Sequence, residues 1–80
     1  MIEVTLYSKE DCHLCHDVKE VLLSVQSVIP FIFREVGITS DPLLLDQFKE
    51  EIPVIFINGR KAFKYRVERN ALIRRLEREQ

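Results

Sequence analysis

The sequence predicts an α/β fold with the element order β-α-β-α-β-β-α, in which a parallel half is followed by a hairpin half. Three observations lead to this prediction. A segment of alternating apolar residues precedes a helical repeat of apolar residues and a second apolar segment, so the chain opens as a β-α-β unit. The apolar run at 52–57 ends at Asn58-Gly59, which is the strongest short signal for a hairpin. A last helical repeat closes the chain, and we expect helices on the faces of a four-stranded sheet.

The N-terminal half is expected to contain a strand, a long helix and a second strand parallel to the first. Period-two alternation at residues 2–7 is typical of a strand. Ser8 or Asp11 is the predicted N-cap of a helix that runs from Cys12 to about Val28, with apolar residues every three or four positions. Residues 31–36 are predicted to form the second strand.

The C-terminal half is expected to begin with a short helix. Asp at the cap position and Pro at the first helical position, in Asp41-Pro42, indicate a helix at about 42–49. The strand predicted at 52–57 is apolar enough to be buried on both faces. Its hairpin partner is predicted at residues 60–65 and the last helix at 68–79. We expect the short helix to bury Leu44, Leu45 and Phe48.

The size and composition of the chain predict one small domain over residues 1–80. Residues 1–59 carry 4 Lys/Arg against 10 Asp/Glu, a balance of −6, and residues 60–80 carry 8 against 3, a balance of +5. We interpret the basic end as an exposed helix face, because glutamates interrupt it and no aromatic residues are interleaved. No nucleic-acid or membrane partner is expected. Without a recognisable export signal or a long apolar run, we expect a cytoplasmic protein.

The only two cysteines, Cys12 and Cys15, lie at the start of the predicted long helix. In a reducing cytoplasm such a pair is typically catalytic or metal-binding rather than structural. Residues at i and i+3 of a helix have Cβ atoms about 5–6 Å apart, near the reach of a disulfide. Backbone N–H groups and the helix dipole favour a thiolate at Cys12, so its pKa is expected below the ordinary value of ~8.5. We therefore expect Cys12 to attack a substrate disulfide and the more buried Cys15 to resolve the mixed disulfide.

Two basic side chains near the pair are candidates for stabilising the Cys12 thiolate. These are Lys9 and His13, whereas the neighbouring Glu10 and Asp11 oppose such an effect. The alternative interpretation is that both side chains only face solvent, Lys9 from a loop and His13 from the first turn of the helix.

Together these features resemble the glutaredoxins of the thioredoxin-like superfamily, and in particular the small bacterial glutaredoxin-like proteins. The matching segments are Tyr7-Ser8-Lys9, Cys12-His13-Leu14-Cys15, Ile52-Pro53-Val54 and Asn58-Gly59. The resemblance implies a thioredoxin-like three-layer fold with a mixed four-stranded sheet. It also implies an enzyme, a thiol–disulfide oxidoreductase without a bound cofactor. In such a protein Pro53 is cis and faces the cysteines, the backbone of Ile52 pairs with substrate, and Lys9 binds a substrate carboxylate or stabilises the thiolate.

The sequence departs from glutathione-using glutaredoxins at two places. His13-Leu14 replaces the Pro-Tyr that usually separates the cysteines, and Tyr65-Arg66-Val67-Glu68 stands where a Gly-Gly and an acidic cluster hold glutathione. The expected partners are therefore a disulfide-containing protein or a low-molecular-weight thiol, of which glutathione is one candidate, and a thiol reductase system. We expect a monomer.

Three other interpretations stay open. Two copies of the chain could hold zinc or an iron–sulfur cluster between their Cys12 and Cys15 pairs, since one chain lacks a second pair of zinc ligands. The segment Cys12–His16 spells Cys-x-x-Cys-His, the signature of haem c attachment, although Met1 is the only methionine. The third interpretation is a non-catalytic interaction domain that uses its basic face.

Overall fold

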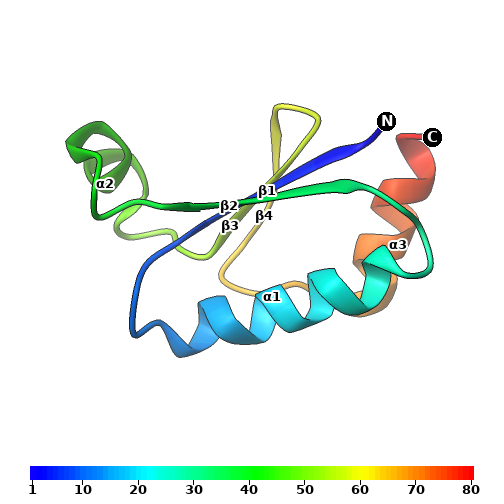
Figure 1. Cartoon of the computed structure of the whole chain (residues 1–80), viewed down its shortest axis with the longest axis horizontal. Coiled ribbons are helices and arrows are strands. Elements are labelled where there is room, and N and C mark those ends of the chain that lie inside the picture. The colour runs from blue at the N-terminus through cyan, green and yellow to red at the C-terminus, as the bar shows by residue number, and fades with distance from the viewer.

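In the computed structural model, which describes residues 1–80, seven elements follow one another in the predicted order. The four strands form one mixed sheet in the order β2-β1-β3-β4 (Figure 1). β1 runs parallel to β2 and antiparallel to β3, which pairs antiparallel with β4. The elements are β1 (Glu3–Ser8), α1 (His13–Gln26), β2 (Ile32–Gly37), α2 (Pro42–Phe48), β3 (Val54–Ile57), β4 (Arg60–Lys64) and α3 (Arg69–Arg78).

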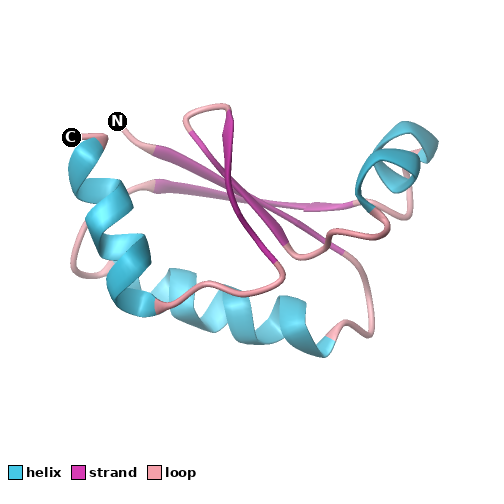
Figure 2. Cartoon of the chain, turned by 180° about the vertical axis from the view of Figure 1, so that it is seen from behind, coloured by secondary structure: helices cyan, strands magenta, loops and turns pink.

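The sheet lies between two layers of helix, which Figure 2 shows from behind. α1 and α3 cover one face, and α2 packs at one end of the opposite face. The alternation of side chains along β1 explains this division, because Val4 and Leu6 enter the core under α1 and α3, whereas Tyr7 packs under α2. The predicted three-layer α/β architecture is therefore confirmed. None of the helices is both long enough and apolar enough to cross a bilayer.

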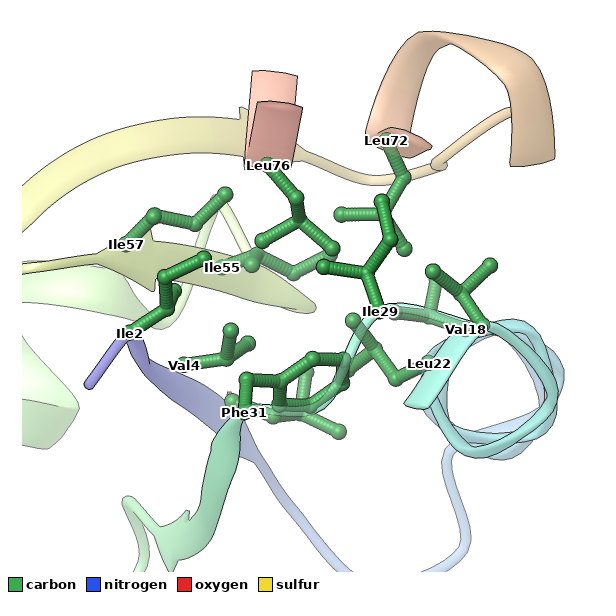
Figure 3. Close-up of a cluster of buried hydrophobic side chains, with 12 residues drawn as sticks. Ile2, Val4, Val18, Leu22, Ile29, Phe31, Ile55, Ile57, Leu72 and Leu76 are labelled. Atoms are coloured by element: carbon green, nitrogen blue, oxygen red, sulfur yellow. The ribbon is translucent and has the colours of Figure 1, made fainter. Parts of the chain in front are cut away.

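The larger core fills the space between the sheet and the α1/α3 layer (Figure 3). Leu22 of α1 and Leu72 of α3 have no exposed surface, and burying a leucine side chain contributes about 1.5–3 kcal/mol. This core fixes the axis of α1 against the sheet, and therefore also the position of its N-terminus. The buried members are Ile2, Val4, Leu6, Val18, Leu22, Val25, Ile29, Phe31, Ile55, Ile57, Leu72 and Leu76.

A smaller core under α2 is built around three aromatic rings. The ring of Phe48 lies 4.8 Å from that of Tyr7, and Phe56 meets the two rings edge-on at 5.8 and 5.3 Å. Phe48 is buried as predicted and Leu44 is half-buried. The prediction for Leu45 is wrong, because 38% of its surface is exposed. Leu44 and Phe48 share one face of this two-turn helix, and Leu45 lies beside that face.

Two turn signals work as predicted. Asp41 caps α2 by accepting a hydrogen bond of 2.9 Å from the N–H of Leu43, and Pro42 takes the first turn. Asn58 (φ 50°) and Gly59 (φ 81°) form the two-residue turn between β3 and β4, where both residues need positive φ.

Several elements are shorter than predicted, and α1 and β3 show why. α1 ends at Gln26 rather than Val28, since Ser27 forms its C-cap. β3 begins at Val54, because Ile52 and Pro53 precede the hydrogen-bonded ladder with β1.

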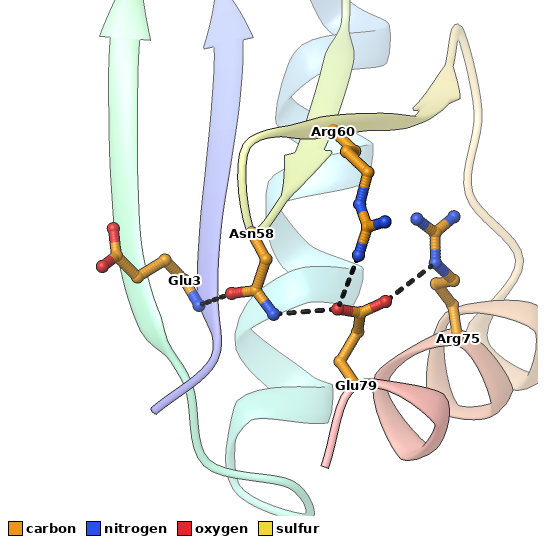
Figure 4. A network of polar contacts seen from close by, with 5 residues as sticks. All are labelled: Glu3, Asn58, Arg60, Arg75 and Glu79. Carbon is orange, nitrogen blue, oxygen red and sulfur yellow. Dashed lines mark hydrogen bonds and ion pairs between the residues drawn. The ribbon is translucent and has the colours of Figure 1, made fainter.

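The turn between β3 and β4 also fixes the C-terminal end of the chain (Figure 4). Asn58 accepts a hydrogen bond of 2.9 Å from the N–H of Glu3 and donates one of 2.9 Å to the carboxylate of Glu79. Arg60 and Arg75 each lie 3.6 Å from the same carboxylate. The hydrogen bond from Asn58, followed by the charges of the two arginines, lowers the pKa of Glu79. These contacts lie at the start of β1, away from the cysteines that follow its other end.

Candidate functional site

The cysteines lie in the turn that connects β1 to α1. The chain turns at Asp11, whose φ is 56°. Cys12 follows in an extended conformation (φ −107°, ψ 105°) and is itself the N-cap of α1. The prediction that Ser8 or Asp11 caps this helix is wrong. The positive φ of Asp11 places the turn one residue before the cap, and the Ser8 hydroxyl is hydrogen-bonded to Glu35 of β2.

The two sulfur atoms are within disulfide-bonding distance, and the Cα atoms of Cys12 and Cys15 are 5.2 Å apart. The backbone N–H of Cys15 also donates a hydrogen bond of 3.2 Å to the Sγ of Cys12. Cys15 is buried with 3% of its surface exposed, whereas Cys12 is only half-buried. The predicted difference in burial is confirmed. The pair therefore consists of one accessible sulfur, which accepts a hydrogen bond from the helix N-terminus, and one buried sulfur.

Neither of the two basic candidates forms a hydrogen bond to the sulfur of Cys12, whose one donor is the N–H of Cys15. Lys9 is exposed, forms no ion pair or side-chain hydrogen bond, and lines a polar depression with Thr39 and Ser40. His13 lines the shallow depression that contains Cys12, but its side chain is 89% exposed and lies 3.6 Å from Asp17, to which it pairs when protonated.

Ile52 and Pro53 lie at the same end of the sheet as the cysteine turn. The pairing of Tyr7 with Val54 places the start of β3 beside the end of β1. The peptide bond between Ile52 and Pro53 is cis, and Pro53 is buried. The carbonyl of Pro53 accepts a hydrogen bond of 2.8 Å from the N–H of Tyr65, whereas the backbone of Ile52 forms no hydrogen bond.

A polar cluster behind the cysteine turn was not predicted. Ser8 is 5% exposed and donates a hydrogen bond of 3.1 Å to Glu35, whose other carboxylate oxygen lies 2.8 Å from the ammonium of Lys19. The hydrogen bond from Lys19 lowers the pKa of Glu35 below its ordinary value of 4.5, although partial burial opposes this shift. The cluster ties the first turns of α1 to the ends of β1 and β2. One signal was available in the sequence. Glu35 follows Phe31 and Phe33 at alternate positions, which places its carboxylate on the apolar face of the predicted strand, where it needs a partner.

No group of three or more His, Cys, Asp and Glu side chains in the chain is arranged to hold a metal ion. His16 lies 3.4 Å from Glu20 and pairs with it when protonated.

The sequence profile of the glutaredoxin-like domain family (DUF836) matches residues 3–77. The chain belongs to this family. A curated relative, a glutaredoxin-like protein of Dictyostelium discoideum, is 28% identical in an alignment 82 positions long that covers 95% of this chain and 76% of that protein. The expected glutaredoxin-like, thioredoxin-superfamily identity is therefore confirmed.

Solved structures support the same fold for this glutaredoxin-like protein. Protein XcR50 of X. campestris superposes with a TM-score of 0.80 at 28% identity, over 94% of this chain and 96% of that one. Protein Ne2328 of Nitrosomonas europaea gives a TM-score of 0.80 at 20% identity, over 92% and 89% of the two chains. Mitochondrial thioredoxin 3 of Saccharomyces cerevisiae gives 0.71 at 14% identity, over 96% and 77%. The last two show the likeness of fold alone. Family, fold and the cysteine pair at disulfide distance together support a thiol–disulfide redox function.

We predict that the role of Cys12 as N-cap can be separated from its role in the disulfide. Cys12→Ala and Cys12→Ser both remove the disulfide, but only serine keeps an acceptor for the N–H of Cys15. In the presence of a reductant, the alanine variant should be less stable than the serine variant by about 0.5–2 kcal/mol. Urea denaturation followed by circular dichroism measures this difference. Equal stabilities would mean that the hydrogen bond at the cap contributes nothing.

We also predict a pH-dependent contribution from Glu35. Its lowered pKa means that the folded state favours the ionised carboxylate, so the contribution is complete above the ordinary value of 4.5 and is lost as pH falls through the lower folded value. The wild type should therefore be more stable than Glu35→Gln at neutral pH, and the difference should shrink as pH falls below 4.5.

The matched control is Glu10→Gln, since Glu10 is exposed and its side chain has no partner. Denaturation curves of the three proteins across this pH range give the comparison. A penalty for Glu35→Gln that stayed constant from neutral to acid pH would contradict the assignment.

Proposed function

We propose that this glutaredoxin-like protein is a thiol–disulfide oxidoreductase in which Cys12 is the nucleophile and Cys15 is the resolving thiol. The observation that supports this most directly is the position of the Cys12 sulfur. It lies at the N-cap of α1, 3.2 Å from the amide nitrogen of Cys15 and within disulfide distance of the Cys15 sulfur. A sulfur in this position exchanges between thiolate, mixed disulfide and internal disulfide with little movement of the chain.

The first step uses the accessible sulfur. In the reduced protein, the helix dipole and the N–H of Cys15 favour the thiolate of Cys12. This thiolate attacks one sulfur of a substrate disulfide, so that a bond forms between Cys12 and the substrate while the substrate S–S bond breaks. The departing substrate sulfur leaves as a thiolate and takes a proton from water.

The second step uses the buried sulfur. Cys15 gives up its proton to water or to the departing thiolate and attacks the Cys12 sulfur, which closes the internal disulfide and breaks the mixed disulfide. The second substrate sulfur then leaves as a thiol. The protein loses two electrons and the substrate gains them, and the reverse sequence oxidises a dithiol. A thiol reductase system returns the protein to the reduced state.

The other candidate residues act on the substrate around this pair. We propose that an extended segment of the substrate pairs with the free backbone of Ile52 beside Pro53, in the manner of an added β-strand. Lys9 contacts a substrate carboxylate from the rim of the site. His13 stabilises the thiolate when its exposed imidazole turns away from Asp17.

The substrate class is a disulfide-containing protein or a low-molecular-weight disulfide. We place the reaction in the cytoplasm, where reductase systems keep thiols reduced. We further propose that residues 1–80 work as a single monomeric domain. The exchange itself passes electrons between sulfur atoms and needs no cofactor.

Two single-cysteine variants test the assignment of roles, and each serves as the control for the other. The reduced proteins are mixed with bis(2-hydroxyethyl) disulfide and followed by intact mass. The wild type should form its internal disulfide, and Cys15→Ser should accumulate the mixed disulfide on Cys12 because no resolving thiol remains. Cys12→Ser should leave exchange at the background rate, since its one thiol is buried. If Cys12→Ser exchanged as fast as the wild type, the proposed mechanism would be wrong.

A further inference from the structure

A groove of about 310 Å³ lies between α1 and the segment that joins β4 to α3. Leu14 and Val21 line its α1 side, and Tyr65 and Val67 line the opposite side. Figures 1 and 2 show this connecting segment running beside α1. Neither cysteine lines the groove, but Leu14 lies between the two in sequence, so one end of the groove is close to the redox pair. Its volume is at the small end of the range for ligand pockets, about 300–1,000 Å³, which suits one or two amino-acid side chains.

Tyr65 has a backbone conformation that is rare for a bulky residue, with a φ of 69°. A tight turn closes around it, since the N–H of Arg66 donates to the carbonyl of Lys64 over 2.8 Å. The N–H of Tyr65 donates to the carbonyl of Pro53 and its hydroxyl to the carbonyl of Glu50, over 2.8 and 2.7 Å. Such conformations persist where surrounding contacts impose them, and they gather at functional sites. One wall of the groove is therefore held rigidly against Pro53.

Two charged groups line the groove, Asp17 on α1 and Arg66 on the opposite side. Asp17 lies 3.6 Å from His13 and pairs with it when that histidine is protonated. The carboxylate of Glu68, two residues after Arg66, is not its partner, because it caps α3 by accepting a hydrogen bond of 2.7 Å from the N–H of Ala71. Arg66 itself is exposed and its side chain forms neither an ion pair nor a hydrogen bond. The rim of the groove thus combines an apolar surface with a free guanidinium group.

We propose that this groove selects disulfide-containing proteins that carry an apolar residue and an acidic residue on the two sides of the reactive cysteine. The apolar side chain enters between Leu14 and Val67, and the carboxylate pairs with Arg66, whose planar guanidinium group matches carboxylate geometry. Lys64 and Arg69 lie close in sequence and add to the positive potential that attracts an acidic partner. The inference rests on the proposed exchange at Cys12.

Three short peptides test this selectivity. They contain the sequences Leu-Cys-Glu, Leu-Cys-Lys and Ala-Cys-Glu, each joined through its cysteine to 2-mercaptoethanol as a mixed disulfide. The rate with the reduced protein is divided by the rate with dithiothreitol, which removes differences in intrinsic reactivity. We expect the Leu-Cys-Glu peptide to react about threefold to tenfold faster than Leu-Cys-Lys at low salt, and faster than Ala-Cys-Glu by a similar factor. The preference for glutamate should weaken in about 0.5 M salt.

Charge variants separate the groove from the overall charge of the protein. Arg66→Glu should reverse the preference between the Glu and Lys peptides, and Arg66→Gln should bring their rates close to equality. Arg74→Glu is the matched control, because Arg74 is exposed on α3, has no ion-pair partner and does not line the groove. It should leave the preference within about twofold of the wild type.

Each result decides between clear alternatives. Equal normalised rates for the three peptides with the wild type would overturn the inference. Equal shifts in Arg66→Glu and Arg74→Glu would overturn it too, because net charge would then account for the preference. If the wild type failed to exchange with bis(2-hydroxyethyl) disulfide as well, the proposed oxidoreductase function itself would fail, and the inference with it.

Discussion

The burial of one face of α1 against the sheet is the interaction on which the cysteine site depends. The buried residues of this helix, Cys15, Val18, Leu22 and Val25, recur at spacings of three and four, so Cys15 is the first member of the apolar stripe. Its burial follows from the same periodicity that packs the helix. Cys12, three residues earlier, lies just outside the helix and stays accessible. One helix thus places two chemically identical side chains in different surroundings, and the roles that we propose for Cys12 and Cys15 rest on that difference.

The two ends of the central strand β1 have different structural roles. At its start, the Asn58 and Glu79 contacts join the first strand, the hairpin turn and the last helix. At its end, the strand leads into the cysteine turn, and its pairing with β3 brings the segment of Pro53 to the same end of the sheet. The ion pair of Lys19 with Glu35 holds the first turns of α1 at this end of the sheet. Movement of the helix there would separate the cysteines from the sheet.

The elements that could be predicted from the sequence are those with one buried face or a turn with a strict backbone requirement. The period of two in β1, the period of three to four in α1 and the Asn58-Gly59 turn are local signals, and the structure confirms all three. The N-cap of α1 was not predictable in this way, because Ser8, Asp11 and Cys12 are all candidates for the cap position. The positive φ of Asp11 places the turn before Cys12 and so makes Cys12 the cap. Tyr65 takes a positive φ against its own preference, since hydrogen bonds to distant carbonyls impose it. The ion pair of Glu35 with Lys19 was likewise not predictable, because tertiary packing brings the two residues together from different elements.

The measurement that tests the central claim most directly is a redox titration of the purified protein in glutathione buffers, with free thiols trapped by an alkylating agent and counted by mass. The account predicts that Cys12 and Cys15 lose and regain their thiols together, in one reversible two-electron transition with a tenfold change in ratio per ~30 mV. Two sulfurs that titrated separately, each as a mixed disulfide with glutathione, would contradict it. Thiols that stayed protected until a chelator was added would contradict it as well, in favour of a metal site.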